Sequence, residues 1–153
     1  MKKLVMILFL LILSLLGFSQ KISMKKVPIT VVTTFRIKFP QAHKVHWFYD
    51  KEENIYFALF RLNLVPHECE FNTDGKWIIT EIDTDRDSLP KLVADSIDAH
   101  FPNYEIVEVQ TVQFSLNNTV VYLVDIENHK GDKEMIIRIS SEGVIIEIKK
   151  YHY

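Results

Sequence analysis

Six histidines are the side chains of this 153-residue sequence best suited to metal chemistry, but their spacing does not favour it. His43 and His46 are three residues apart, which on a regular strand directs the two rings to opposite faces. His67 is followed by Glu68 and Glu70, yet no third imidazole or thiolate is aligned with them as a zinc site requires. The spacing of the histidines therefore indicates that they lie on the surface, in loops and strands, and we expect no cofactor.

Cys69 is the sole cysteine, so the chain cannot form an internal disulfide and must be stabilised by its core. Glu68 and Glu70 flank the thiol, and their charges disfavour the thiolate that a nucleophile needs. We expect a small buried side chain here. The sequence also has no Gly-x-Ser-x-Gly motif and no glycine-rich phosphate loop, so it predicts a protein that is not an enzyme.

The acidic segment "DTDRDS" opens as a calcium-binding loop does, with Asp83, Asp85 and Asp87 alternating. Ser88 stands where such a loop requires glycine, and Ala94 where its closing glutamate should be. We interpret the segment as a solvated connector whose acidic residues suit the N-terminus of a following helix, with a metal site as the alternative.

Aromatic side chains supply the candidate protein-binding residues: Trp47, Tyr49, Tyr56 and Trp77. Trp47, Phe48 and Tyr49 are consecutive, so on a strand at least one ring must lie on the face away from a covering helix. Such rings can anchor a protein or peptide. The alternative is that they belong to the core or fill a seam between two halves, since large aromatic residues are usually buried.

The segment 1–19 predicts a signal peptide. Lys2 and Lys3 precede the apolar stretch "LVMILFLLILSLLGF", and Gly17 and Ser19 are small residues of the kind found at a cleavage site, expected near Ser19 and Gln20. The alternative is an uncleaved anchor, although the stretch is short for the about 20 apolar residues of a membrane span. We expect a periplasmic or secreted protein that has no membrane contact after cleavage.

Without Lys2 and Lys3, the predicted mature chain carries 18 − 2 = 16 basic and 20 acidic side chains, a net charge of 16 − 20 = −4 with histidines neutral. The sequence has no cluster of basic residues, which argues against nucleic acid as a partner. The length of the mature chain is enough for one compact domain or two small fused halves.

Two Phe-Pro motifs, "FPQAHKV" from Phe39 and "FPNYEIV" from Phe101, are offset by 101 − 39 = 62 in the numbering. The residues before them match at the same offset: Val27 with Leu89, Pro28 with Pro90, Val31 with Val93, and Phe35 with Ile97. These ungapped matches indicate a tandem duplication.

Each copy begins with a predicted helix. In the second copy, Leu89, Leu92, Val93, Ile97 and Phe101 form one apolar stripe at helical spacing. The first copy, "PITVVTTFRIKF", is rich in β-branched residues and alternates as a strand would. The repeat nevertheless favours a helix there, because packing overrides weak local propensity.

Alternating apolar runs separated by turn residues then predict four strands in each copy. They span residues 44–49, 54–62, 67–71 and 76–82 in the first copy, and 105–114, 119–126, 134–139 and 144–150 in the second. The predicted fold is α+β, with two tandem repeats (27–82 and 88–150), each one helix packed on a four-stranded antiparallel meander. A helix on one face leaves the other free for solvent or a partner.

Scattered motifs occur along the chain: Pro28-x-x-Val31, Phe39-Pro40, Val45-x-Trp47, Tyr56-x-Ala58-x-Phe60, Phe71-x-x-Asp74-Gly75-x-Trp77 and Leu89-Pro90-x-x-Val93. Together they resemble the PepSY-like family of small bacterial envelope proteins, described as like the β-lactamase-inhibitor protein. The resemblance covers residues 27–150, but Glu142-Gly143 replaces an Asp-Gly turn and Val109 stands where the second copy should match Trp47.

The resemblance implies an exported protein with a curved composite sheet and no catalytic residues; the inhibitor relatives hold a protein enzyme in the concave face. We therefore expect a non-enzymatic module that binds or inhibits an envelope or secreted protein through its open sheet face. The alternatives are a small apolar or peptide ligand bound at the seam between the repeats, and a hydrolase.

Overall fold

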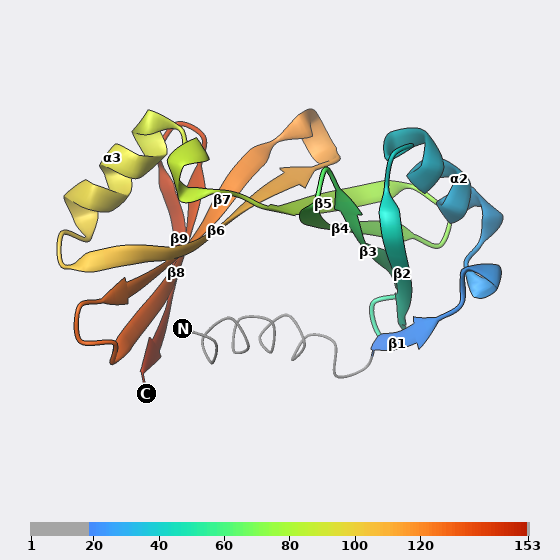
Figure 1. Cartoon of the computed structure of the whole chain (residues 1–153), viewed down its shortest axis with the longest axis horizontal. Helices are drawn as coiled ribbons and strands as arrows, with labels where there is room; N and C mark the ends of the chain where they lie inside the picture. The colour runs from blue at the N-terminus through green and yellow to red at the C-terminus, as the bar shows by residue number, and fades with distance from the viewer. Residues whose placement is uncertain (1–18, 153) are drawn as a thin grey trace. The chain divides into compact units, whose positions relative to one another are not determined.

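The computed structural model describes residues 19–152 (Figure 1). This part of the chain is α+β, with two α-helices and nine strands joined in antiparallel pairs. The chain divides into two compact units, with the boundary between Ile78 and Ile79. Apart from Ser19, the predicted signal peptide lies outside the described residues.

The first unit holds a helix and the first four strands, which are hydrogen-bonded in sequence order. Its elements are β1 (Ser19–Ile22), the short 3-10 helix η2 (Met24–Lys26), α2 (Ile29–Lys38), β2 (His43–Asp50), β3 (Ile55–Leu62) and β4 (Val65–Asn72). The strand β5 (Trp77–Asp83) starts in this unit and continues into the second.

The segment with strand-like composition is a helix, α2, as the repeat predicted. Phe35 on α2 packs edge-on against Phe60 at 5.1 Å and against Trp47 at 5.2 Å between ring centroids. Fully burying a side chain of this size stabilises the fold by about 1.5–3 kcal/mol. Ile29 and Ile37 are 75% and 77% exposed, so the β-branched residues are spread around the helix instead of lining one face.

The strand β1 is absent from the predicted elements. Its sequence, "SQKI", is short and begins where the signal-peptide cleavage was expected. It pairs with β2 through Gln20 opposite Tyr49 and Ile22 opposite Trp47. The first unit therefore has one additional strand, at the edge of its sheet, that the sequence pattern does not predict.

A β-bulge in β2 corrects the predicted placement of two histidines. His43 pairs with Arg61 and His46 with Leu59, so three steps along β2 match two steps along β3. Lys44 supplies the extra residue, with a positive φ of 54°. Since Arg61 and Leu59 lie on one face of β3, His43 and His46 lie on the same face and not on opposite ones.

The second unit also holds one α-helix and a run of strands. It contains the 3-10 helix η3 (Arg86–Ser88), α3 (Lys91–His100), β6 (Tyr104–Phe114), the 3-10 turn η4 (Leu116–Asn118), β7 (Val120–Asn128), β8 (Lys133–Ser140) and β9 (Ile145–His152). The strand β5 pairs with β6 inside this unit, from Ile79 opposite Phe114 to Asp83 opposite Gln110.

Val93 and Ile97 on α3 are buried against a core of apolar side chains from β6, β7 and β8. The core side chains from these strands are Val109, Val124, Ile126, Met135, Ile137 and Ile139. The predicted apolar stripe is wrong at Leu92, which is 60% exposed. The buried seam runs in four-residue steps from Leu89 through Val93 to Ile97, and Leu92 falls beside it.

The eight predicted strands agree with β2–β5 and β6–β9 to within two residues at every end. The two α-helices correspond at the offset of the Phe-Pro motifs, since Ile29 matches Lys91 at their starts and Lys38 matches His100 at their ends. The units themselves are not simple copies, because β1 adds a strand to the first and β5 pairs with β6 of the second. Within residues 19–152, no helix is long and apolar enough to cross a membrane.

Candidate protein-binding face

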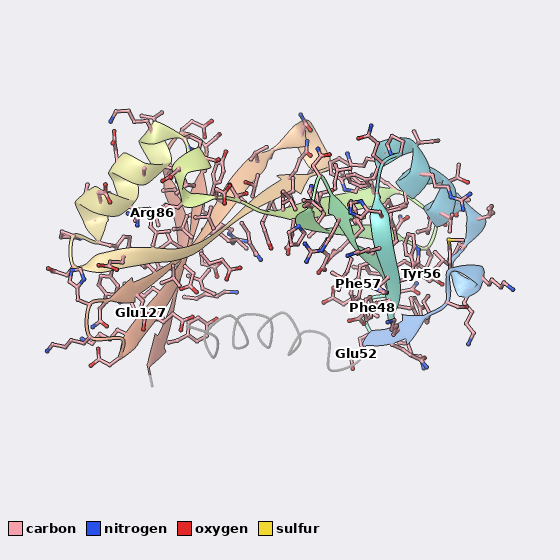
Figure 2. The ribbon with its side chains drawn as sticks, in the orientation of Figure 1. Phe48, Glu52, Tyr56, Phe57, Arg86 and Glu127 are labelled. Carbon is pink, nitrogen blue, oxygen red and sulfur yellow. The ribbon has the colours of Figure 1, made fainter. Side chains whose placement is uncertain are left out.

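The helix α2 covers one face of the β1–β4 sheet, and strand alternation decides which side chains remain on the other face. Trp47 belongs to the core under α2, and Tyr49 lies two residues further along the same face of β2. Phe48, between them, points to the opposite, open face. Figure 2 shows Phe48 and Phe57 on one side of the sheet and Tyr56 on the side of α2.

Phe48 and Phe57 face each other across β2 and β3 and stack nearly parallel. Their ring centroids are 5.1 Å apart and their planes differ by 7°. Phe57 is only 5% exposed although it does not belong to the core cluster under α2, while Phe48 is half-buried. Large aromatic rings on the uncovered face of a sheet are a recurrent anchor for a protein partner.

Half-buried aliphatic residues extend the stack along β3, and polar residues surround it. Ile55 and Leu59 lie two residues on either side of Phe57 and share its face. We call Phe48, Ile55, Phe57 and Leu59 the Phe48 patch. Lys21 of β1 lies opposite Phe48, and Glu70 and Glu68 of β4 lie opposite Phe57 and Leu59. An apolar centre with a charged rim is the usual composition of a protein–protein interface.

The four candidate residues predicted from sequence lie on the other side, with α2. Trp47 is 3% exposed in the core, and Tyr56 and Trp77 pack against that core. Tyr49 stacks on Tyr56 at 4.6 Å between centroids and donates a hydrogen bond to Oδ1 of Asn54. The structure thus brings Tyr49 and Tyr56 together but separates all four from the Phe48 patch.

Trp77 carries a cation–π contact, with the Lys38 ammonium 3.3 Å from the ring centroid. Burial lowers the pKa of Lys38.

Beneath the helix, burial raises the pKa of the Cys69 thiol well above its usual range, and the Glu68 charge raises it further. Cys69 has no exposed surface, which confirms that it is a buried core side chain.

The open face of the second unit is different in character, because carboxylates gather on it. Glu108 lies opposite Asp125 across β6 and β7, and Glu127 lies opposite Glu134 across β7 and β8. Burial, then the charges of Glu134 and Glu108, raise the pKa of Asp125 to about 7. Burial and the charge of Asp83 raise the pKa of Glu108 as well.

Neither unit assembles a metal site from its described residues. Across residues 19–152, no three acidic, histidine or cysteine side chains are placed so that they could hold a metal ion. In the "DTDRDS" segment, Arg86–Ser88 forms the 3-10 turn η3 ahead of α3. The segment connects β5 to α3, as the connector interpretation predicted.

Comparison with solved structures identifies the fold. A DUF2874 family protein from Bacteroides uniformis superposes with a TM-score of 0.73 at 22% identity, covering 80% of this chain and 88% of that one. A structure described as "putative periplasmic proteins" from Bacteroides eggerthii gives 0.72 at 19% identity, covering 81% and 88%. A BLIP-like protein from Bacteroides fragilis gives 0.70 at 16% identity, covering 82% and 87%.

No curated protein matches the chain. A family model described as "Putative beta-lactamase-inhibitor-like, PepSY-like" matches residues 54–147, which is 147 − 54 + 1 = 94 of the 153 residues. This match begins at the turn before β3 and ends within β9, so it includes strands of both units. Because it spans more than half of the sequence, the chain belongs to the PepSY-like family.

Proposed function

We propose that this chain is a non-enzymatic, exported module that binds or inhibits an envelope or secreted protein through the open face of its sheet. The observation that carries the proposal is the Phe48–Phe57 stack, which lies on the sheet face opposite α2. The half-buried Phe48 ring, held by its stack on the buried Phe57 ring, presents a rigid apolar surface that loses little side-chain entropy when a partner covers it.

The family description, inhibitor-like, supports a role in binding a protein. Export is supported by the lysine-led apolar segment at the N-terminus and by the structural neighbour that is described as periplasmic. A protein-binding role also agrees with the charged rim of Lys21, Glu68 and Glu70 around the Phe48 patch, since rim charges select partners more than they add affinity.

We further propose that the two units descend from one duplicated helix-and-strand segment. Pro28 and Pro90 precede the helices with φ, ψ of −54°, 142° and −56°, 140°. Phe39 and Phe101 follow them with −129°, 64° and −130°, 54°. Matching torsions at positions that share one offset support the duplication that the Phe-Pro motifs indicate.

The test of the binding proposal compares two alanine variants. Phe48→Ala removes a ring from the Phe48 patch, and Ile37→Ala removes an exposed apolar side chain from the outer surface of α2. Tagged proteins are used to capture partners from a periplasmic extract, and the affinity for each captured partner is then measured with purified proteins. We expect Phe48→Ala to weaken binding by at least about tenfold, as a hot-spot residue does, and Ile37→Ala to leave it unchanged.

Thermal unfolding of both variants controls for loss of structure. If Phe48→Ala stays folded and holds every partner as tightly as the wild type, the open face of the first unit is not the binding surface. A partner lost only in Ile37→Ala would place binding on α2 and would equally contradict the proposal.

A further inference from the structure

Among the acidic side chains on the sheet face of the second unit opposite α3, four form two directly opposed pairs around Asp125. Glu108 of β6 faces Asp125 of β7, and Glu127 of β7 faces Glu134 of β8. Asp125 and Glu127 are two residues apart on one strand, so all four side chains lie on one face. Directly opposed side chains in an antiparallel pair have Cβ atoms about 4.5–5.5 Å apart, a distance at which like charges repel. We call these four residues the carboxylate cluster.

The centre of the cluster is buried. Asp125 is 6% exposed and Glu134 is 5% exposed, which is rare for acidic residues. Asp125 shares a hydrogen bond with Glu134, but its Oδ1 atom is buried without any hydrogen-bond partner. A buried acceptor that makes no hydrogen bond costs about 1–3 kcal/mol of folding free energy. The unpaired Asp125 Oδ1 atom therefore destabilises the fold, and it lies among side chains of like charge.

The register places two cations of the neighbouring strands, Arg138 and Lys149, on the same face as the cluster. The Arg138 guanidinium of β8 pairs with Glu147 of β9 at 2.7 Å. Lys149 of β9 lies opposite Ile136 and is exposed. The other titratable residues on this face and at its edges are Glu81 and Asp83 of β5, Glu105 of β6, His129, which pairs with Glu105, and Tyr151 of β9.

We propose that the carboxylate cluster binds a guanidinium or ammonium group presented by a basic segment of the partner protein. This inference rests on the proposed function and names the chemistry of the partner that the second unit would select. An arginine can donate from several N–H groups in one plane, which suits Asp125 Oδ1 and the carboxylates on either side of it. A metal ion suits the cluster less well, because among the described residues no three carboxylates converge as metal ligands.

Binding of a cation here must be coupled to release of a proton. In the free protein the pKa of Asp125 is raised to about 7, chiefly by burial and by the Glu134 charge. A guanidinium beside Asp125 favours its ionised form, so the carboxyl proton leaves to solvent when the cation binds. Affinity should therefore increase as pH rises through about 7, a dependence that an arginine peptide, charged at all these pH values, cannot itself produce.

The experiment is a calorimetric titration of the purified protein with a tetra-arginine peptide at pH 6 and pH 8. The peptide is acetylated at its N-terminus and amidated at its C-terminus, so that no group of the peptide titrates in this range. Each titration is run in two buffers of different ionisation enthalpy, which reports the number of protons released. We expect binding several-fold tighter at pH 8, release of up to one proton at pH 6 but little at pH 8, and no binding of the matched tetra-citrulline peptide, which lacks the charge.

Two variants with the same charge change separate the cluster from general electrostatics. Asp125→Asn should weaken peptide binding and abolish the proton release. Asp98→Asn, on the exposed surface of α3, should behave as the wild type. Unchanged binding and proton release in Asp125→Asn would overturn the inference, as would calcium alone binding to the wild type and not to Asp125→Asn. The peptide titration needs no natural partner. It can therefore fail while the Phe48→Ala capture test succeeds, and it can succeed while the capture test fails.

Discussion

Gly75 lies directly against the first turn of α2, so that a β-carbon at this position would come within 2.7 Å of the carbonyl carbon of Thr30. The second unit repeats the relationship, with a β-carbon on Gly143 falling 2.5 Å from the carbonyl oxygen of Leu92. Thr30 and Leu92 correspond to each other at the same offset as the Phe-Pro motifs. In each unit a glycine turn allows the strands to approach the N-terminal turn of the helix.

Alanine at either glycine should therefore destabilise its unit strongly. Gly75→Ala and Gly143→Ala combine a positive φ, which costs about 1–2 kcal/mol, with a backbone clash that adds about 1–3 kcal/mol. Gly131 has a similar φ of 73° but meets only the end of the Glu127 side chain, so Gly131→Ala should cost about 1–2 kcal/mol. Urea unfolding of the three variants measures the difference. Equal losses would show that the helix contact does not matter.

The helical state of α2 can be tested with two apolar residues that a strand would place on the same face. Phe35 is 5% exposed and Ile37 is 77% exposed. We expect Phe35→Ala to lower the free energy of unfolding by about 3–5 kcal/mol and Ile37→Ala to change it by less than about 0.5 kcal/mol. Comparable losses in both variants, measured by urea unfolding, would favour the strand.

Leu64 is an unfavourable residue for the turn that it occupies. The hairpin between β3 and β4 has Asn63 and Leu64 at its tip with φ of 50° and 70°, and Leu64 is 75% exposed. Such two-residue turns prefer Asn-Gly, because glycine has no β-carbon to clash at positive φ. Leu64→Gly should stabilise the protein by about 0.5–1 kcal/mol, whereas Leu64→Ala, which keeps a β-carbon, should have little effect. A destabilised Leu64→Gly would show that the leucine side chain makes a stabilising contact.

Much of this fold is predictable because local patterns and the internal repeat agree. Helix α3 is predictable from the helical spacing of its apolar residues. The strand positions are predictable from alternating apolar and polar residues and from the turn residues between them. Helix α2 does not follow from its own residues, since β-branched side chains favour a strand; the comparison with the second copy was needed. The strand β1 and the bulge at Lys44 left no signal, because β1 is too short for a pattern and one inserted residue changes neither composition nor hydrophobicity.

The candidate binding surfaces were harder to predict, because they depend on strand register. The run Trp47-Phe48-Tyr49 correctly required a ring on the open face, but the sequence did not say which one. The carboxylate cluster was not predicted. Glu108, Asp125 and Glu134 stand at alternating polar positions of three strands, which is typical of a solvated face. Only the pairing of β6, β7 and β8 brings them together and buries Asp125.

The carboxylate cluster should also make stability depend on pH in a specific direction. The pKa of Asp125 in the folded protein is raised from 3.8 to about 7, first by burial and then by the charges of Glu134 and Glu108. Below pH 3.8 both the folded and the unfolded chain hold this proton. Between pH 3.8 and about 7 only the folded chain holds it, so the contribution of Asp125 to stability falls as pH rises through this window and is constant above it.

Asp125→Asn removes this titration, so the variant should gain stability relative to the wild type as pH rises from 4 to 8. The difference between the two pKa values sets an upper limit of about 4 kcal/mol on the gain, since one pH unit corresponds to about 1.4 kcal/mol. Urea unfolding at one-unit pH steps measures it, with Asp98→Asn expected to follow the wild type throughout. A constant difference between Asp125→Asn and the wild type across the window would mean that Asp125 is already ionised in the folded protein. The buried acceptor would then have to be satisfied by a cation or by ordered water, and the proton release expected on arginine binding would disappear with it.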